Sequence, residues 1–429
     1  MTQYPWKMVC TSCDAEYPAL EVRYRCDCGS TLDVKHDLAR FTDGRAPAPT
    51  RQGFDARLAS RKRLDRSGVW RFRELILPLE PENVVTKPEG NTNLYPAPRV
   101  ASWAGMDALW LKHEGENPTG SFKDRGMTAG MSAARALGME RVAVASTGNT
   151  SASVASYAAQ AGMKAYVFVP DGNIAYGKLC QALAYGARTL QIRGDFDAAM
   201  SLVQAVCQKE GIYLLNSVNP FRIEGQKAIG MEIVQDLDWQ VPDWIVVPGG
   251  NLGNNTAIAK GLVEMKAVGL IDRLPRIAVI QAAGANPLYN AWHSDGVLRP
   301  VKAKTLASAI KIGDPVSFGR SWGWLKALGG VVEQVTDQEI MDAKAQVDAQ
   351  GIGAEPASCA TVAGLKKLVA SGIISPQAQV CGVLTGHVLK DPDAAVAYHR
   401  GTLEGIESSS ANKPVVVDAQ LDSVLRALD

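Results

Sequence analysis

The fold is decided at Asn117-Pro118-Thr119-Gly120-Ser121-Phe122-Lys123-Asp124-Arg125, where a turn rich in proline and glycine leads into a helical pattern and leaves a lysine near the helix start. Ser121 is the type of residue that caps a helix, so we expect the helix to begin there, with Lys123 in its first turn. A cation at that position opposes the helix macrodipole, which favours anions. A lone lysine of this kind is usually an exposed residue compensated by a neighbour, here Asp124. The alternative is a reactive lysine, and the rest of the chain favours it.

Short hydrophobic runs alternate with helical patterns on both sides of this turn. The expected strands are 109–111, 142–145, 165–169, 189–192, 213–215, 244–247 and 277–280, and the expected later helices are 151–161, 176–185, 196–209, 223–237 and 256–268. This alternation is typical of α/β proteins, in which helices cover both faces of parallel sheets. Ligands bind beyond the carboxyl ends of the strands in such sheets, so the polar turns after the strands are the candidate sites.

Composition excludes several classes of function. The 429 residues include 45 basic and 44 acidic ones, so the net charge of +1 provides no global field for binding nucleic acid or an acidic membrane surface. No segment reaches the roughly 18 apolar residues of a membrane span, and the first residues lack the pattern of a signal peptide. We expect a cytoplasmic globular enzyme that binds anions at local sites.

Four of the eight cysteines form two close pairs near the N-terminus. Cys10 and Cys13 have the CxxC spacing, and Cys26 and Cys28 have the CxC spacing, which is less typical of a zinc ribbon. A metal ion bound by four thiolates would supply the folding energy of a segment that is too short for its own hydrophobic core. All four coordination positions of the metal would then be occupied by protein, so none would be open for catalysis. We predict a structural zinc here; the alternative is four reduced cysteines in a small β-module.

The remaining cysteines and the segment that follows the pairs have simpler interpretations. Residues 36–90 are rich in Arg, Asp and Pro and indicate an arm packed on the main body, with 61–63 and 70–73 as solvated basic faces. The other cysteines stand singly in segments that resemble a protein core, so we expect buried thiols at Cys180, Cys207, Cys359 and Cys381.

Three polar turns could bind parts of a ligand. Residues 146–153 gather hydroxyls and an amide at the start of a helix, which suits a carboxylate. Residues 248–255 form a glycine-rich turn whose N–H groups suit one phosphate, although Pro248 departs from GxGxxG and a tight βα turn is the alternative. The third turn holds Thr385, whose hydroxyl could meet a ring nitrogen, and His387, which we expect to be an ordinary satisfied histidine. Together with a reactive lysine, these features describe a pyridoxal phosphate site.

Five segments resemble those of the threonine synthase family, a member of the tryptophan-synthase-β-like group of pyridoxal phosphate enzymes. They are 117–125, 146–153, 216–227, 249–254 and 384–391, and the resemblance extends from about residue 70 to near the C-terminus. Single motifs are shared with threonine dehydratases and cysteine synthases, whereas 216–227 and 384–391 are more particular. The match is closest to the plant-type branch, which has an N-terminal arm and is activated by S-adenosylmethionine. The cysteine pairs and the bacterial-type segment 355–358 differ from that branch, so we do not predict this activation.

The resemblance implies a domain organisation and a homodimer. From the cysteine spacing and the composition, we expect a zinc-ribbon-like module at 1–35 and an arm at 36–90. The two-domain fold of pyridoxal phosphate enzymes of fold type II would span 91–429, with a smaller domain inserted at about 126–240.

The resemblance also implies the site residues. Lys123 would bind the cofactor covalently and act as the catalytic residue, with Asn149 at the phenolic oxygen and Thr385 at the pyridine nitrogen. The residues implied at the cofactor phosphate are Gly250, Asn251, Leu252, Gly253 and Asn254. Those implied at the substrate carboxylate are Ser146, Thr147 and Thr150. A second phosphate site would use Asn216, Ser217, Asn219 and Arg222, since guanidinium binds phosphate through paired donors.

In this family O-phospho-L-homoserine and water become L-threonine and phosphate, through γ-elimination and β-addition of water. Lys123 would move protons at Cα, Cβ and Cγ, provided that burial and neighbouring cations lower its pKa. A closed site should exclude stray water. The alternatives are an enzyme similar to cysteate synthase, which acts on phosphoserine, and a serine or threonine dehydratase. A further alternative is a binding protein without enzymatic activity that keeps the fold and recruits a partner through its zinc ribbon.

Overall fold

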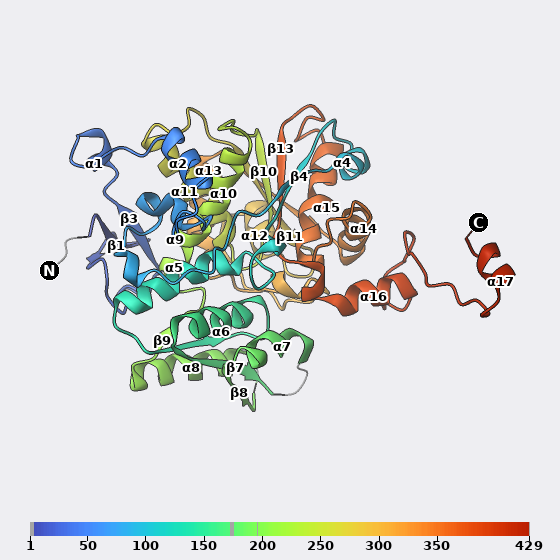
Figure 1. Ribbon diagram of the computed structural model, residues 1–429, viewed down its shortest axis with the longest axis horizontal. Coiled ribbons are helices and arrows are strands. Elements are labelled where there is room, and N and C mark those ends of the chain that lie inside the picture. Colours follow the sequence, from blue (N-terminus) through green and yellow to red (C-terminus); the bar gives the residue numbers. More distant parts are fainter. Residues whose placement is uncertain (1–3, 172–175, 195, 429) are drawn as a thin grey trace.

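Three β-sheets organise the chain, of which the computed structural model describes residues 4–171, 176–194 and 196–428. Their strand orders are β2-β1-β3, β12-β11-β10-β13-β5-β4 and β8-β7-β6-β9. Figure 1 shows the six-stranded sheet in the upper part of the molecule and the four-stranded sheet below it. The C-terminal segment, with α16 Pro392–Arg400 and α17 Leu421–Arg426, extends away from both.

The six-stranded sheet is parallel except at one edge, where β4 runs antiparallel to β5. Its strands are β4 Leu94–Pro96, β5 Trp110–His113, β10 Trp244–Pro248, β11 Arg276–Ala282, β12 Val331–Val335 and β13 Val380–Leu384. The helices α4 Pro98–Ala104, α14 Asp337–Ala349 and α15 Pro356–Ala370 cover one face, and α10 Ala228–Asp236 and α11 Gly253–Ala267 cover the other. Val246 packs toward the first group, whereas Ile245 and Val247 pack toward the second. Because both faces are covered, every residue of β10 is buried.

The four-stranded sheet is entirely parallel. Its strands are β6 Arg141–Ala145, β7 Lys164–Pro170, β8 Arg188–Ile192 and β9 Tyr213–Leu214, and its helices are α6 Asn149–Ala161, α7 Tyr176–Ala184 and α8 Phe196–Glu210. The sheet lies within the segment expected to form the inserted domain, 126–240, and the boundaries themselves stay a prediction. The helix α5 Lys123–Ala136 packs against both α6 and α9 Phe221–Gln226.

The alternation of strands and helices is confirmed, and each expected strand is present within about two residues of its expected ends. The structure divides the helix expected at 223–237 into α9 and α10, which meet at Lys227. In this region α9 packs closely against α5. Gly225 permits that approach, because a Cβ there would lie 1.8 Å from the carbonyl oxygen of Arg125.

The arm expected at 36–90 stays a prediction in its bounds, and only part of the basic sequence of this segment faces solvent. Residues 61–63 are exposed as expected, whereas Trp70, Arg71 and Phe72 are fully buried, so a solvated face at 70–73 is wrong. The reason is specific pairing: Trp70 Nε1 donates to Thr128 Oγ1 at 2.8 Å, and Arg71 Nη2 lies 3.2 Å from Glu232 Oε1. The helices of the arm are α1 Ala39–Thr42, α2 Arg51–Leu58 and α3 Arg73–Ile76.

The isolated cysteines are reduced, and three of the four are buried as expected. Cys180 is exposed, which corrects the expectation of a buried thiol. It lies on the outer face of α7, whereas its neighbours Leu179 and Ala182 turn into the core.

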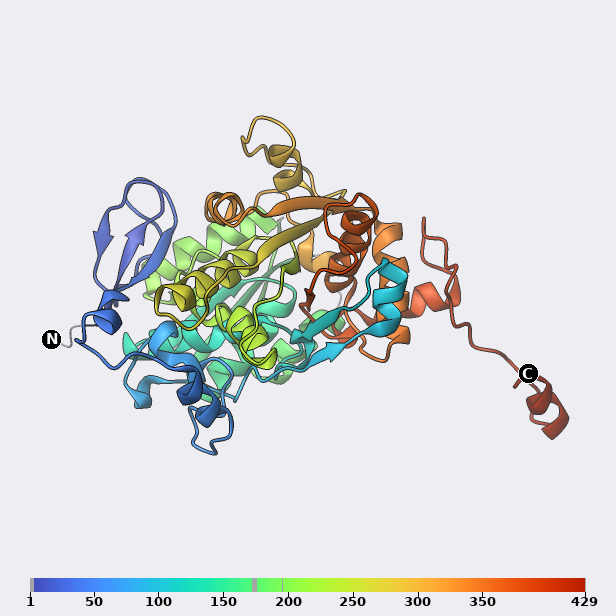
Figure 2. The same ribbon diagram turned by 90° about the horizontal axis from the view of Figure 1, so that it is seen from above.

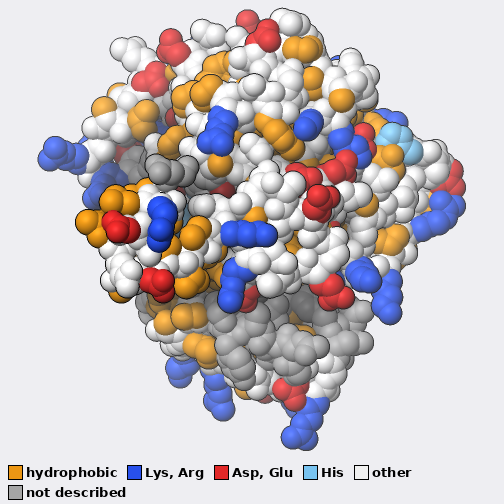
Figure 3. Space-filling model, turned by 90° about the vertical axis from the view of Figure 1, so that its right-hand side faces the viewer, with side chains coloured by type: hydrophobic (Ala, Val, Ile, Leu, Met, Phe, Trp, Pro, Cys, Tyr) orange, Lys and Arg blue, Asp and Glu red, His pale blue; other side chains and the backbone are white. Residues whose placement is uncertain are grey.

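Charged side chains of one sign do not gather on the face of the molecule drawn in Figure 3. Basic and acidic side chains are interspersed over the described part of this face, with hydrophobic side chains scattered among them. Among the described helices, none combines the length and apolarity needed to cross a membrane.

The remaining α-helices are α12 Pro287–Trp292 and α13 Phe318–Ala327.

The N-terminal residues 4–36, which we call the cysteine module, contain the antiparallel strands β1 Trp6–Cys10, β2 Glu16–Tyr17 and β3 Leu32–His36. Figure 2 shows this module at the opposite end of the molecule from α17. The Sγ atoms of Cys10, Cys13, Cys26 and Cys28 all lie within 4.8 Å of one another. Four thiolates around zinc lie about 3.8 Å apart, given Zn–S bonds of about 2.3 Å, so the four cysteines fit a closed structural site.

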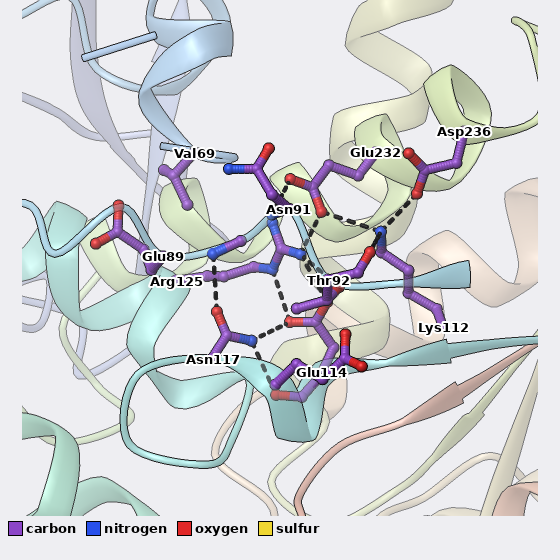
Figure 4. A network of polar contacts seen from close by, with 12 residues as sticks. Val69, Glu89, Asn91, Thr92, Lys112, Glu114, Asn117, Arg125, Glu232 and Asp236 are labelled. Atoms are coloured by element: carbon purple, nitrogen blue, oxygen red, sulfur yellow. Dashed lines mark hydrogen bonds and ion pairs between the residues drawn. The ribbon is translucent and has the colours of Figure 1, made fainter. Parts of the chain in front are cut away.

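A buried network of charges joins the arm, α5, α10 and the six-stranded sheet (Figure 4). Arg125 Nε and Nη2 each lie 2.6 Å from the carboxylate of Glu114, and Nη2 also lies 2.5 Å from Glu232. Glu232 also forms ion pairs with Lys112 Nζ, at 3.1 Å, and with Arg71. Burial alone would raise the pKa of Glu232, but these cations hold it below its ordinary value. The network fixes the first turn of α5, which begins at Lys123.

We expect purified protein to contain about one zinc per chain, because the four thiolates complete a tetrahedral site. Elemental analysis checks this directly. Cys13→Ser should lose the metal, whereas Cys180→Ser, a matched change at an exposed cysteine outside the module, should retain it. Wild-type protein purified without stoichiometric metal would contradict the assignment.

We expect Glu232→Ala to lower the free energy of unfolding by about 3 to 5 kcal/mol, because it leaves buried cations uncompensated. Urea denaturation measures the change. The control is Glu210→Ala, which removes a surface carboxylate 3.8 Å from Arg141 and should cost less than about 1 kcal/mol. Equal losses in the two variants would show that the network does not stabilise the fold.

Candidate functional site

The lysine turn lies against the loop that follows β13. Phe122 N donates to Thr385 O at 3.0 Å, His387 N donates to Gly120 O at 3.0 Å, and Ser121 forms a β-bridge with Gly386. The structure therefore brings together two segments that are about 260 residues apart in the chain, both expected at the site.

Ser121 does not cap the helix, which corrects our expectation. The N-cap is Phe122, without a side-chain hydrogen bond, and α5 begins at Lys123. The bridge to Gly386 holds the backbone of Ser121, and its Oγ is buried without a partner among the described residues. Such an orphaned hydroxyl beside the lysine indicates a place for a ligand atom.

Lys123 stands in the first turn of α5, as expected, and is not an exposed lysine compensated by Asp124. The Asp124 carboxylate instead accepts from Thr119 N at 2.6 Å and from Ser153 Oγ at 2.6 Å. Burial of its amine lowers the pKa of Lys123 to about 7, and the guanidinium of Arg222 acts in the same direction. The side chain keeps part of its accessible surface. A partly accessible amine with a pKa near neutrality is suited to covalent and proton-transfer chemistry.

The hydroxyl-rich turn at 146–153 lies at the start of α6, which begins at Asn149 rather than at residue 151. Ser151 Oγ donates to Gly148 O at 2.7 Å and so shapes the turn. The predicted carboxylate residues Ser146, Thr147 and Thr150 are each partly exposed. Ser146 Oγ accepts from Gly148 N at 3.3 Å, so a ligand carboxylate would have to share this hydroxyl.

Glu355 lies beside the predicted site residue Asn149, although the sequence had indicated no role for it there. Asn149 Nδ2 lies 3.1 Å from both of its carboxylate oxygens, although the two residues are 206 positions apart. Burial raises the pKa of Glu355. The pair joins the helix α6 to the start of α15 and fixes the orientation of the Asn149 amide. The only signal in the sequence is a glutamate before Pro356, at a helix start.

Thr385 follows β13 and is held by α15. Its Oγ1 lies 3.0 Å from Ser358 Oγ, which also accepts from Gly386 N at 2.9 Å. His387 is a satisfied histidine, as expected: its Nδ1 accepts from Leu389 N at 3.2 Å, and its ring lies against that of His113.

The glycine-rich turn lies between β10 and α11, which begins at Gly253 and not at Thr256. Leu252 has a φ of 63°, so the backbone reverses its curvature just before the helix, as in an anion-binding nest. The first N–H groups of a helix have no partner within it. Both amide atoms of Asn254 are buried without a partner among the described residues, which indicates a polar ligand there.

The segment before and within α9 holds the four residues predicted for a second phosphate. Asn216 pairs its amide with the backbone N–H and C=O of Ala145, both at 3.0 Å, and Asn219 Nδ2 donates to Leu214 O at 3.0 Å. These two amides are therefore engaged in shaping the segment, and Ser217 is partly exposed. Their assignment to phosphate stays a prediction.

Arg222 is different from these amides because its charge is not compensated. Its Nη1 donates to Leu215 O at 2.9 Å, and its Nε is buried without a partner among the described residues. Burial lowers the pKa of Arg222 to about 10. In the described part of the chain no carboxylate lies within salt-bridge distance, so a bound anion would relieve the cost of burying this guanidinium.

Pyridoxal phosphate fits the residues that converge here. The nest and the unpartnered Asn254 suit its phosphate, Lys123 suits its aldehyde, and Thr385 and Asn149 suit the polar atoms of its ring.

Comparison with known proteins identifies the family. The family model described as "Pyridoxal-phosphate dependent enzyme" matches residues 85–386. The threonine synthase of Methanosarcina acetivorans is 44% identical over 427 residues, which cover 99% of this chain and 98% of that protein. The one of Methanocaldococcus jannaschii is 43% identical over 390 residues, covering 90% and 93%. "Threonine synthase 2, chloroplastic" of Arabidopsis thaliana is 41% identical over 424 residues, covering 96% and 82%.

The fold agrees with this result. The crystal structure of threonine synthase from Escherichia coli covers 98% of this chain and 94% of its own, with a TM-score of 0.69 and 18% sequence identity. At that identity the likeness concerns the fold alone. The sequence relatives and the family model together show that the chain belongs to the threonine synthase family of pyridoxal-phosphate-dependent enzymes.

Proposed function

We propose that this enzyme converts O-phospho-L-homoserine and water into L-threonine and phosphate. The observation that carries the proposal is the uncompensated guanidinium of Arg222, close enough to Lys123 to lower its pKa. The cofactor phosphate takes the nest at α11, and the substrate carboxylate takes the turn at α6. Arg222 is a further cationic centre, which only a substrate with a second anionic group requires. A serine or threonine dehydratase has no use for it.

The site residues divide the work among them. The backbone at Gly250, Asn251, Leu252 and Gly253, with the amide of Asn254, holds the cofactor phosphate, and Asn149 and Thr385 hold its ring. Ser146, Thr147 and Thr150 orient the substrate carboxylate, and Arg222 binds its phosphate together with Asn216, Ser217 and Asn219. Glu355 accepts from the Asn149 amide and so would fix the orientation in which Asn149 meets the cofactor. When bound, the cofactor supplies an electron sink for the substrate carbons.

Lys123 moves the protons. Its free amine would take a proton from Cα and one from Cβ, and would return one proton to Cγ and, at the end, one to Cα. A pKa of about 7 suits this role, because both the free amine and the ammonium are populated at neutral pH. Water attacks Cβ after phosphate has left Cγ.

We further propose a homodimer in the cytoplasm, as the resemblance suggests. The relatives include archaeal enzymes and a plant one, so placement in the plant-type branch remains part of the proposal.

Covalent capture of pyridoxal phosphate by cofactor-free protein should accelerate as the pH rises through about 7 and then level off. Lys123 has a pKa lowered from 10.5, so its nucleophilic neutral form prevails above about pH 7. Stopped-flow absorbance of the lysine-bound cofactor measures the rate. Free Nα-acetyl-lysine is the control, and its rate should still rise toward pH 10. A protein rate that also rises to pH 10, or colour retained by Lys123→Ala, would contradict the assignment.

The substrate assay tests the proposed function. Wild-type enzyme should release phosphate and form threonine from O-phospho-L-homoserine, and should be inactive with O-phosphoserine plus sulfite. Arg222→Ala should keep the visible absorbance of the bound cofactor and lose about 100-fold or more in kcat/KM, since a buried charged hydrogen-bond partner of the phosphate is removed. Turnover of phosphoserine with sulfite alone would replace the proposal with a cysteate-synthase-like activity. Unchanged kinetics in Arg222→Ala would remove this residue from the phosphate site.

A further inference from the structure

The cysteine module touches the segment that carries Arg222 at three separate points. We call this segment, residues 214–224, the anion segment. Tyr24 Oη accepts a hydrogen bond from the backbone N–H of Leu214 at 2.7 Å, at the end of β9. The ring of Trp6 packs edge-to-face on Phe221, the neighbour of Arg222, with centroids 5.6 Å apart. His36 Nε2 lies 2.7 Å from Glu224 Oε2, two residues beyond Arg222.

The contact at Glu224 belongs to a buried ionic cluster. The Glu224 carboxylate also lies 2.5 Å from Lys227 Nζ and 2.6 Å from Lys260 Nζ, and Lys260 Nζ reaches Asp33 of β3 at 2.9 Å. His36, Glu224 and Glu264 lie close enough to suggest a metal site. The ammonium of Lys227 lies among them, 2.6 Å from Glu264 and 3.3 Å from His36, so the trio is already neutralised by a side chain. The cluster therefore joins the module to the body.

The anion segment needs such support because little regular structure holds it. It consists of the end of the two-residue strand β9, a loop, and the start of the six-residue helix α9. Asn216 ties the segment to the backbone of Ala145 in β6, and Asn219 hydrogen-bonds within the segment to the backbone of Leu214. The guanidinium of Arg222 must also stay in a fixed place, although no described carboxylate pairs with it. A displacement of about 1 Å would weaken a paired guanidinium–phosphate contact.

We propose that the cysteine module is the positioning element of the substrate-phosphate site: Tyr24, Trp6 and His36 hold the anion segment so that Arg222 meets the phosphate of the substrate. The proposal rests on the function proposed above. It gives the module a role in substrate affinity, although none of its residues contacts the substrate.

Phosphate binding by the holoenzyme tests the proposal without turnover. The nest at α11 is filled by the cofactor in holoenzyme, so inorganic phosphate reports on the second site. Titration calorimetry should show about three- to tenfold weaker phosphate binding in Tyr24→Phe and in His36→Ala, as expected for the loss of one buried hydrogen bond. KM for O-phospho-L-homoserine should rise by a similar factor with a smaller change in kcat, and the cofactor absorbance should not change. His36→Gln, which keeps a donor for Glu224, should recover most of the affinity.

Tyr398→Phe is the matched control. Its hydroxyl also accepts a backbone N–H, from Ser410 at 3.2 Å, but it lies on α16, outside the module and the anion segment. It should bind phosphate as wild type does. Both variants of the module should remain folded, because Glu224 keeps Lys227 and Lys260 in His36→Ala, and Tyr24→Phe keeps its ring.

The outcomes separate this inference from the proposed function. If Arg222→Ala loses phosphate binding while Tyr24→Phe and His36→Ala bind phosphate as wild type does, the inference is wrong and the substrate site stands. If Arg222→Ala itself binds phosphate as wild type does, the site is wrong and the inference is overturned with it. Equal weakening in Tyr398→Phe would show a general effect of lost hydrogen bonds and would also overturn the inference.

Discussion

The guanidinium of Arg125, held between Glu114 and Glu232, is the interaction on which the site depends. Arg125 lies two residues after Lys123, so the fork that it makes with Glu114 fixes the first turn of α5 in rotation as well as in position. Glu232 comes from α10 and also receives Lys112 from β5 and Arg71 from the arm. Buried ions of this kind stabilise a structure only as a complete set, because each unpaired member carries a large desolvation cost. The lysine turn is therefore fixed by elements from four parts of the chain.

The site itself follows the opposite rule. Around Arg125, charge is matched by charge, and around Glu224 two lysines and a histidine share the carboxylates. Lys123 and Arg222, by contrast, are two basic groups close enough for the guanidinium to lower the pKa of the amine, and burial shifts the pKa of both downward. Glu355, whose pKa is raised by burial, opposes the lowering of the Lys123 pKa only in part. The protein thus leaves positive charge uncompensated at the place where we propose that anionic groups of cofactor and substrate bind, so that a ligand would contribute the missing charges.

Local patterns were enough to predict much of this arrangement. The strands, the nest after β10 and the lysine at the start of α5 depend on neighbouring residues, and they were predicted within a few positions. The failures concern partners distant in the sequence. Ser121 does not cap α5 because its backbone pairs with Gly386, and Trp70 to Phe72 are buried because Thr128 and Glu232 receive them. Glu355 was missed because its role depends on a hydrogen bond from Asn149, which is 206 positions away in the sequence and has no spacing pattern with it. The residue roles taken from the family resemblance could not have come from periodicity at all.

The order of synthesis gives the contact between His36 and Glu224 a further meaning. The two residues are 188 positions apart, so at a synthesis rate of about 5 to 20 residues per second β3 leaves the ribosome about 10 to 40 s before α9. During that interval the module has no body to pack on. Zinc bound by the four thiolates would provide folding energy within the first 36 residues, which would allow the module to form before its partner exists. The body then folds onto a surface that is already shaped, and the first part of the chain to appear serves as a template for a part of the site that is synthesised later.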